Sequence, residues 1–151
     1  MQVRNIECHF EGVDPFQIFH SYLQDQINRL VENEGKQLGE LGIIFCSDQY
    51  LLEMNRKYLQ HDYFTDIITF NYNENQVVKG DLFISSERVK DNAEKYAVNF
   101  RQELYRVIYH GLLHLTGYDD KTDEERLLMR EKENYYLSFT DFNLVDHEFE
   151  I

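Results

Sequence analysis

The spacing of apolar and polar positions along the chain predicts four strands and five helices. Runs of apolar and β-branched residues predict strands at 2–10, 38–46, 66–72 and 76–85, the last interrupted at Lys79 and Gly80. Apolar residues at intervals of three and four predict helices at about 14–34, 48–58, 86–97, 99–115 and 122–137. The chain therefore reads strand, helix, strand, helix, two strands and three helices.

Residues typical of helix caps mark the ends of several of these helices. Asp14 followed by a proline is the pattern of an N-cap and a first helical residue, and Gly35 is placed to end the helix that follows. Gly117 is expected to end the fourth helix. Thr122 and Glu125 have the spacing of a capping box, which places the start of the last helix there.

This order of elements predicts an α+β fold in which a small mixed sheet of about four strands is covered by helices. The 151 residues contain no internal repeat and no linker. We therefore expect one domain over residues 1–151, with a loosely held acidic tail from about residue 139.

Composition and charge exclude several classes of protein. The two cysteines, Cys8 and Cys46, are too few for a disulfide scaffold or a cysteine-based zinc ribbon. No stretch reaches the roughly 18 apolar residues of a membrane span, and the first residues lack the apolar core of a signal peptide. We therefore expect a cytoplasmic protein without membrane contact.

The net charge of −13 argues against a broad surface for nucleic acid, and we expect no DNA partner. Residues 119–151 carry eleven acidic and four basic side chains, so the acidity is concentrated there and a small basic groove can exist elsewhere. The aromatic residues, 15% of the chain, are expected to pack in the core and sheet rather than to form a base-stacking platform.

The segment around His110 carries the chemistry. His110 and His114 are four residues apart, so on a helix they lie one turn apart on one face, at the margin of its buried stripe. Two imidazoles in this arrangement can share a tetrahedral metal ion. Gly117 can turn the chain back under the end of the helix, so that Asp119 or Asp120 approaches the same point.

The spacing matches that of metzincin zinc proteases, in which two histidines, a glycine and a third ligand follow at fixed offsets. His110, His114, Gly117 and Asp120 have these offsets, and we predict that the two histidines and Asp120 bind a metal ion with a fourth position left for water. The position of the protease's catalytic glutamate holds Gly111, so no such general base is present. The other four histidines have no partner at ligand spacing and are expected on the surface or in the core: His9, His20, His61 and His147.

The same segment resembles the signature of the YbeY-type endoribonucleases, bacterial rRNA maturation factors. It reads His-Gly-Leu-Leu-His-Leu-Thr-Gly-Tyr-Asp-Asp at 110–120, where the family has His-Gly-x-Leu-His-Leu-x-Gly-Tyr-Asp-His. Two further blocks resemble the family in the same order, Thr-Asp-Ile-Ile-Thr-Phe at 65–70 and Gly-Asp-Leu-Phe-Ile-Ser at 80–85. The similarity covers about residues 40–135.

This resemblance implies a zincin-like arrangement, a small mixed sheet with the metal helix packed beside it. It implies a metal-dependent endoribonuclease that cuts single-stranded RNA, matures the 3′ end of the small-subunit (16S) rRNA and takes part in ribosome quality control. It also implies one zinc ion per chain as cofactor and the ribosome as partner.

Two positions depart from the family pattern. Asp120 replaces the last histidine and adds a negative charge, so we expect a bound water to be less acidified than with three imidazoles. Leu59 occupies the position of an arginine in the family. If that arginine holds phosphate, another cation must do so here; the candidates are Arg56, Lys57, Arg101 and Arg106. Of these we single out Arg106, which precedes His110 by one turn, and Arg56, as candidate substrate-binding residues. The alternative for Arg106 is an ion pair with Glu103.

The expected reaction is metal-assisted hydrolysis of a phosphodiester, in which the ion polarises a phosphoryl oxygen and activates water. No general base can be named, and Asp119 is expected to cap the helix or support a ligand. Thr65 and Asp66 either orient a ligand histidine or form a strand end. The alternative functions are a metallopeptidase, an oxygenase with iron on two histidines and a carboxylate, and a non-catalytic ribosome-assembly factor with a structural metal.

Overall fold

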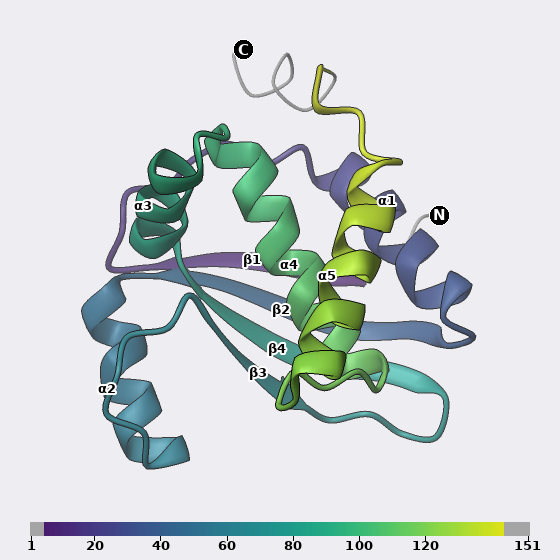
Figure 1. The fold of residues 1–151 in the computed structure, drawn as a ribbon, viewed down its shortest axis with the longest axis horizontal. Coiled ribbons are helices and arrows are strands. Elements are labelled where there is room, and N and C mark those ends of the chain that lie inside the picture. Colours follow the sequence, from purple (N-terminus) through teal and green to yellow (C-terminus); the bar gives the residue numbers. More distant parts are fainter. Residues whose placement is uncertain (1–4, 144–151) are drawn as a thin grey trace.

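The computed structural model describes residues 5–143, and it has the order of elements that the sequence predicts (Figure 1). Along the chain these are β1 (Ile6–Glu11), α1 (His20–Asn33), β2 (Gln37–Cys46), α2 (Asp48–Leu59), β3 (Ile67–Asn71), β4 (Val77–Ser85), α3 (Ser86–Tyr96), α4 (Phe100–Thr116) and α5 (Asp123–Leu137). Among the described residues, none of the helices is both long and apolar enough to cross a bilayer.

The four strands form one mixed sheet in the order β1-β2-β4-β3. β1, β2 and β4 are parallel, and β3 is antiparallel to β4 at the edge. The expected α+β class with a small mixed sheet is therefore confirmed. The antiparallel edge matters for the site, because it brings the start of β3 and the loop before it beside the helical layer.

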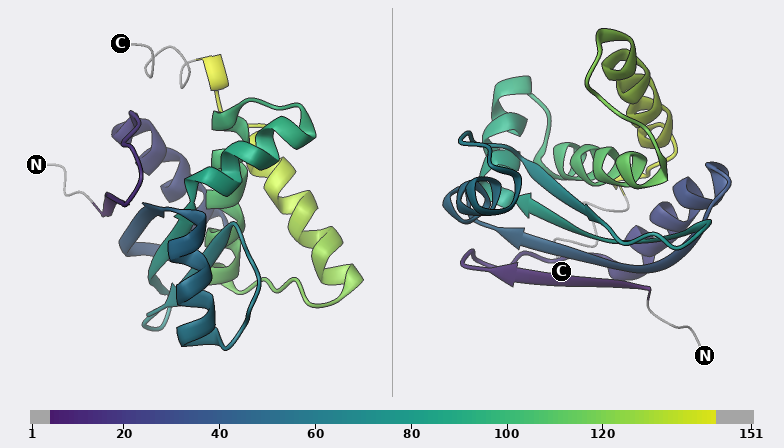
Figure 2. Two further views of the ribbon diagram at one scale, coloured as in Figure 1. Left: turned by 90° about the vertical axis from the view of Figure 1, so that its left-hand side faces the viewer. Right: turned by 90° about the horizontal axis from the view of Figure 1, so that it is seen from below.

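The helix α4 lies directly on the sheet, and α5 lies outside α4 (Figure 2). α4 contacts β3, β4, α1, α3 and α5, so it is the central helix of the molecule. Its inner face is almost fully buried, for example at Leu104, Ile108 and Leu112, which are at most 2% exposed. Burial of this stripe fixes the rotation of α4 and therefore the direction in which its polar residues point.

Gly111 marks the closest approach of α4 to the sheet. A Cβ atom at this position would lie 2.7 Å from the Ile67 side chain and 2.9 Å from that of Leu82. Position 111, which holds the general base in the protease motif, therefore faces the interior. A longer side chain here would have to displace residues of β3 and β4.

Two features of the predicted secondary structure are wrong, the start of the first helix and a break in the last strand. The first helix begins at His20, not at Asp14, because Phe16 is held in a cluster of aromatic rings with Phe10, Phe45 and Phe100. Packing of this ring into the core outweighs the local N-cap and proline signals.

The fourth strand is continuous through Gly80, where an interruption was expected. A Cβ atom at Gly80 would lie 2.4 Å from the carbonyl oxygen of Phe70, so the glycine permits close pairing of β3 and β4 there.

The other predicted helix caps are confirmed. Ser47 and Ser85 cap α2 and α3, the capping box at Thr122 starts α5, and Gly35 follows α1 with a positive φ of 79°.

The two ends of the chain are described only in part. Residues 2–4 of the expected first strand and residues 144–151 of the expected acidic tail lie outside the described residues. The beginning of the C-terminal segment is packed: Thr140 is 9% exposed, and its hydroxyl lies 2.6 Å from that of Tyr109 on α4.

Candidate metal centre

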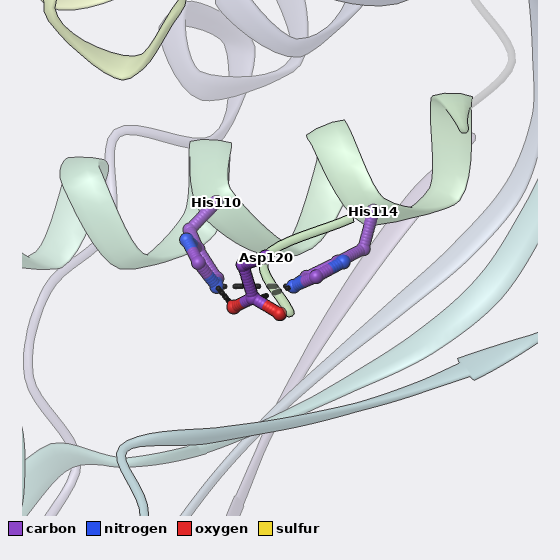
Figure 3. Close-up of side chains that lie close together, drawn as sticks. All are labelled: His110, His114 and Asp120. Carbon is purple, nitrogen blue, oxygen red and sulfur yellow. Dashed lines mark hydrogen bonds and ion pairs between the residues drawn. The ribbon is translucent and has the colours of Figure 1, made fainter. Parts of the chain in front are cut away.

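His110 and His114 project from the same side of α4, and Asp120 approaches them from the loop that follows (Figure 3). Their Nε2 atoms are 3.1 Å apart, and Oδ2 of Asp120 lies 3.3 Å from each of them. The two imidazoles are about a quarter exposed, so they border a cavity rather than the core. Among the described residues, this is the one group of three or more His, Cys, Asp or Glu side chains close enough to share an ion.

Gly117 creates this convergence. Its φ of 116° is a conformation that residues with a side chain rarely adopt, and it caps α4. The next amide, that of Tyr118, donates to the Leu113 carbonyl, so the chain reverses beneath the last turn. Of the two aspartates that the sequence left open, Asp120 turns inward and Asp119 is exposed.

Both histidines are oriented through their Nδ1 atoms. Nδ1 of His114 lies 3.0 Å from the carbonyl oxygen of Tyr118, which can only accept, so this nitrogen donates. Nδ1 of His110 lies 2.7 Å from Oε2 of Glu133. With both Nδ1 atoms donating, the Nε2 lone pairs face one another and the Asp120 carboxylate.

The donor set fits a metal ion. Three electron-pair donors at these separations repel one another unless a proton or a metal cation lies between them. Around a tetrahedral zinc ion with bonds of about 2.0–2.2 Å, ligand atoms lie roughly 3.3–3.5 Å apart. The three separations of 3.1, 3.3 and 3.3 Å are near this value, so the side chains are arranged for an ion before it arrives.

Glu133 was not identified from the sequence as part of the site. It lies on α5, is 5% exposed, and accepts from His110 through one oxygen and from the Arg106 guanidinium, at 3.0 Å, through the other. Burial alone would raise the pKa of Glu133, but the hydrogen bond and charge of His110 and the bond from Arg106 outweigh it, so the pKa is lowered. Glu133 is therefore a buried carboxylate that holds the imidazole of a candidate ligand.

The charge of Glu133 also acts on His110. Burial would lower the pKa of this imidazole, but the hydrogen bond and charge of Glu133, followed by Asp66 and Asp120, raise it. The centre therefore attracts positive charge, whether that of a proton or of a metal ion.

We expect Glu133→Gln to weaken metal binding about 10- to 100-fold, because a carboxylate that holds a ligand histidine makes it a better donor. Titration with zinc in a competing chelator measures this. Glu131→Gln, on the exposed side of α5, is the matched control and should bind like the parent. Equal affinities of the two variants would contradict the role of Glu133.

A second carboxylate anchors the loop that carries Asp120. Glu34, at the end of α1, accepts from the Tyr118 hydroxyl at 2.6 Å and from the Tyr136 hydroxyl, and pairs with Lys132 at 3.3 Å. Burial raises the pKa of Glu34, but the two hydroxyl donors and Lys132 outweigh it and the pKa is lowered. The same residue, Tyr118, thus fixes the loop through its hydroxyl and His114 through its carbonyl.

The three candidate ligands line a cavity of about 550 Å³ between α4, α5, the start of β3 and the loop after α2. Asp66 lies half-buried in its wall. Burial raises the pKa of the Asp66 carboxyl, although the charge of His110 opposes this. Glu103 also lines the cavity, and burial raises its pKa against the charge of Arg106.

The candidate substrate-binding cations are placed differently. Arg106 lines the cavity, but its ion pair is with Glu133 and not with the expected Glu103, and it also donates to Asn134. Arg56 is ion-paired with Asp62 on the exposed side of α2 and is not among the residues lining the cavity. Leu59, at the position of the family arginine, does line it.

Arg130, which the sequence analysis did not consider, also lines the cavity and has a 58% exposed side chain. Arg130 and Glu133 are three residues apart on α5, which is the spacing of an ordinary surface ion pair. The sequence therefore gave no indication that Arg130 lies beside the candidate metal ligands.

Comparison with known proteins agrees with the motifs. The family model described as Endoribonuclease YbeY matches residues 11–141. A curated protein of Phocaeicola vulgatus with the same description is 54% identical over 133 residues, 88% of this chain and 96% of that protein. One from Parabacteroides distasonis is 51% identical over 112 residues, covering 74% and 79%. Among solved structures, that of TM1509 from Thermotoga maritima matches with a TM-score of 0.60 and 27% identity, over 87% of this chain and 86% of that one.

Proposed function

The chain belongs to the YbeY family of endoribonucleases, and from this membership and the geometry of its site we propose that it cuts unpaired RNA at a single metal ion held by His110, His114 and Asp120. The family resemblance read from the sequence motifs is thereby confirmed, and the chain is an endoribonuclease with a role in rRNA processing. The ligands, the ion and the RNA strand it cuts are the parts that we propose.

One observation supports the metal site above all others. The Nε2 atoms of His110 and His114 and a carboxylate oxygen of Asp120 meet within 3.3 Å, while both Nδ1 atoms are occupied by acceptors on other parts of the fold. A buried carboxylate and a backbone carbonyl thus hold the two rings in the orientation that metal binding needs. Two imidazoles and one carboxylate are ligands typical of zinc, which we propose as the ion.

When bound, such an ion polarises a phosphoryl oxygen and lowers the pKa of a water molecule. The chain's own residues supply the surroundings. Glu133 holds His110, and the Tyr118 carbonyl holds His114, so neither ring can turn away. Arg126 and Arg130 are the two exposed cations of the cavity wall. Arg130, whose ion pair with Glu133 is a long 3.7 Å, is the one to which we assign the contact to the phosphate that Leu59 cannot make.

We further propose that the substrate is the 3′ region of small-subunit rRNA, that the protein acts on ribosomal particles and that it does so in the cytoplasm. This proposal extends the role of the family to the present chain. The low density of free cations in the cavity supports a local contact with RNA rather than a broad one.

The structure disfavours the peptidase alternative. Its general base would occupy position 111, which faces Ile67 and Leu82 in the interior and not the cavity. An assembly factor with a structural metal would not need a cavity of about 550 Å³ beside the ion.

The test is cleavage of a labelled single-stranded RNA and of the same sequence in a duplex by zinc-loaded protein. We expect internal cuts in the single strand only, their loss on chelation and their return when zinc is added. Cleavage that persists in chelator would remove the metal from the mechanism. Ribosome association without cleavage of any RNA would favour the assembly factor, and chelator-sensitive hydrolysis of casein would favour the peptidase.

A further inference from the structure

We propose that His61 and Tyr63 form a platform on which an unpaired nucleobase stacks, in the wall of the cavity that contains the candidate metal ligands. The inference rests on the proposed function, because it gives a place to the RNA strand that is cut. It modifies the expectation that the aromatic residues serve only core and sheet packing, and it gives His61, expected to be an ordinary surface or core histidine, the role of supporting the tyrosine ring.

The two rings belong to a loop that is held in place from within. After α2 the chain turns at Gln60, which has a positive φ of 56°. Asn55, only 1% exposed, then binds the loop twice: its carbonyl accepts from the His61 amide at 3.0 Å, and its side-chain amide donates to the Tyr63 carbonyl at 2.9 Å. The exposure of the rings is therefore a consequence of a fixed backbone and not of a loose loop.

The rings themselves are arranged in parallel. Their centroids are 5.1 Å apart at an interplanar angle of 20°, and the Tyr63 hydroxyl lies 3.0 Å from Nδ1 of His61. Tyr63 remains 56% exposed, and both residues line the cavity with His110, His114 and Asp120. A pre-stacked pair with an open face is suited to a further flat ring, because little side-chain freedom is lost when that ring binds.

The side-chain charges of the cavity favour such a contact. Four carboxylates line it, and only three arginines oppose them: Asp66, Glu103, Asp120 and Glu133 against Arg106, Arg126 and Arg130.

All three arginines already have carboxylate partners. Arg106 and Arg130 pair with Glu133, at 3.0 and 3.7 Å, and Arg126 pairs with Asp123 and donates to the backbone of the loop at 120–121. A bound metal ion would attract the phosphate that is cut, but few free cations remain for the neighbouring phosphates, whose attraction usually dominates RNA affinity. Stacking on aromatic rings supplies affinity without further positive charge.

The platform also accounts for a preference for single strands. In a duplex both faces of each base are covered by its neighbours, so no face is free for Tyr63. An unpaired base can leave the strand's own stack, and every base offers a π-face, so we expect little dependence on base identity.

The test uses the absence of tryptophan from the chain. In Tyr63→Trp the new indole is the only one, and stopped-flow mixing of the zinc-loaded variant with decauridylate should quench its fluorescence in the binding phase, before cleavage. A duplex decamer should not quench it. Tyr72→Trp is the matched control, because Tyr72 is 55% exposed but lies outside this cavity, and its fluorescence should not change.

The loss of the ring gives the second measurement. Tyr63→Ala should raise KM for the single-stranded RNA about tenfold, with kcat changed by less than about twofold, whereas Tyr72→Ala should behave like the parent. His61→Ala should have a smaller effect of the same kind, because it removes the support of the tyrosine ring.

The outcomes separate this inference from the proposed function. A parent that cuts RNA while Tyr63→Trp shows no quenching, or while Tyr63→Ala keeps the parent's KM, overturns the platform alone. Quenching by RNA that is never cut keeps the platform and overturns the nuclease. If Tyr63→Ala binds RNA normally but no longer associates with ribosomes, the rings contact a protein and the platform is likewise overturned.

Discussion

Replacing His114 by alanine is expected to abolish both metal binding and RNA cleavage while the protein stays folded. The substitution leaves only two of the proposed ligands, His110 and Asp120, in the cavity wall. Loss of a residue that merely supports a ligand weakens metal binding about 10- to 100-fold, so loss of the ligand itself should exceed this range. We expect cleavage to fall at least about 1000-fold, because both the polarising charge and the activated water are lost together.

Folding should survive this change. The His114 side chain is 23% exposed at the edge of the core, and alanine favours a helix more than histidine does. The metal-free parent and the metal-free variant should therefore melt at similar temperatures.

The response to zinc then distinguishes the two proteins. At a free zinc concentration of 100 times Kd, binding adds about 2.7 kcal/mol to the parent's free energy of unfolding. For a chain of this size that raises Tm by roughly 5–10 °C. The variant should show almost no rise.

Metal content after dialysis, thermal melts with and without zinc, and cleavage of single-stranded RNA are the three measurements. His9→Ala is the control, since His9 is also a histidine that lines a cavity but is 58% exposed and outside the centre. A His114→Ala protein that cuts RNA as fast as the parent would refute the metal site as the place of catalysis.

Replacing Gly111 by glutamate is expected to destabilise the fold severely without creating a peptidase. A Cβ atom at this position already meets the side chains of Ile67 and Leu82 at 2.7 and 2.9 Å. Overpacking costs about 1–3 kcal/mol, and an unpaired carboxylate directed into the interior costs several more. We expect the free energy of unfolding to fall by at least about 3 kcal/mol and Tm by at least about 6 °C.

Two variants control for size and charge. Gly111→Ala should change stability by only about 1 kcal/mol, because the higher helix propensity of alanine offsets part of the crowding. Leu127→Glu adds the same charge to an exposed position of α5, where Leu127 is 63% exposed, and should be tolerated. Thermal and urea unfolding provide the comparison. If the Gly111→Glu protein is as stable as the parent and hydrolyses casein, which the parent should not, the glutamate side chain reaches the cavity and this prediction is wrong.

The two errors in the predicted secondary structure have a common origin. Asp14 and the proline after it have the residue types of a helix start, but the helix begins at His20 because Phe16 is drawn into a cluster with rings from β1, β2 and α4. Gly80 was expected to interrupt a strand, yet it allows β3 to approach β4. In both cases a contact with a distant part of the chain outweighs a local preference of modest energy.

Within the site, some residues could be predicted from the local sequence and others could not. His110, His114, Gly117 and Asp120 lie within eleven residues, and helix geometry together with one positive φ brings them together. Glu133 and the pair of His61 and Tyr63 come from other elements, and nothing in their local spacing links them to the centre.

The sequence by itself determined the order of strands and helices, the turn at Gly117 and the three residues that converge there, because each depends on periodicity, capping or conformational freedom over a few neighbouring residues. Only the tertiary structure decided what surrounds them. The packing of α5 on α4 gave His110 its buried carboxylate, and the loop held by Asn55 brought two aromatic rings to the cavity. His110 and Glu133 are 23 positions apart, and His61 and His110, which line the same cavity, are 49 apart. Their proximity depends on how whole elements bury their apolar faces against one another.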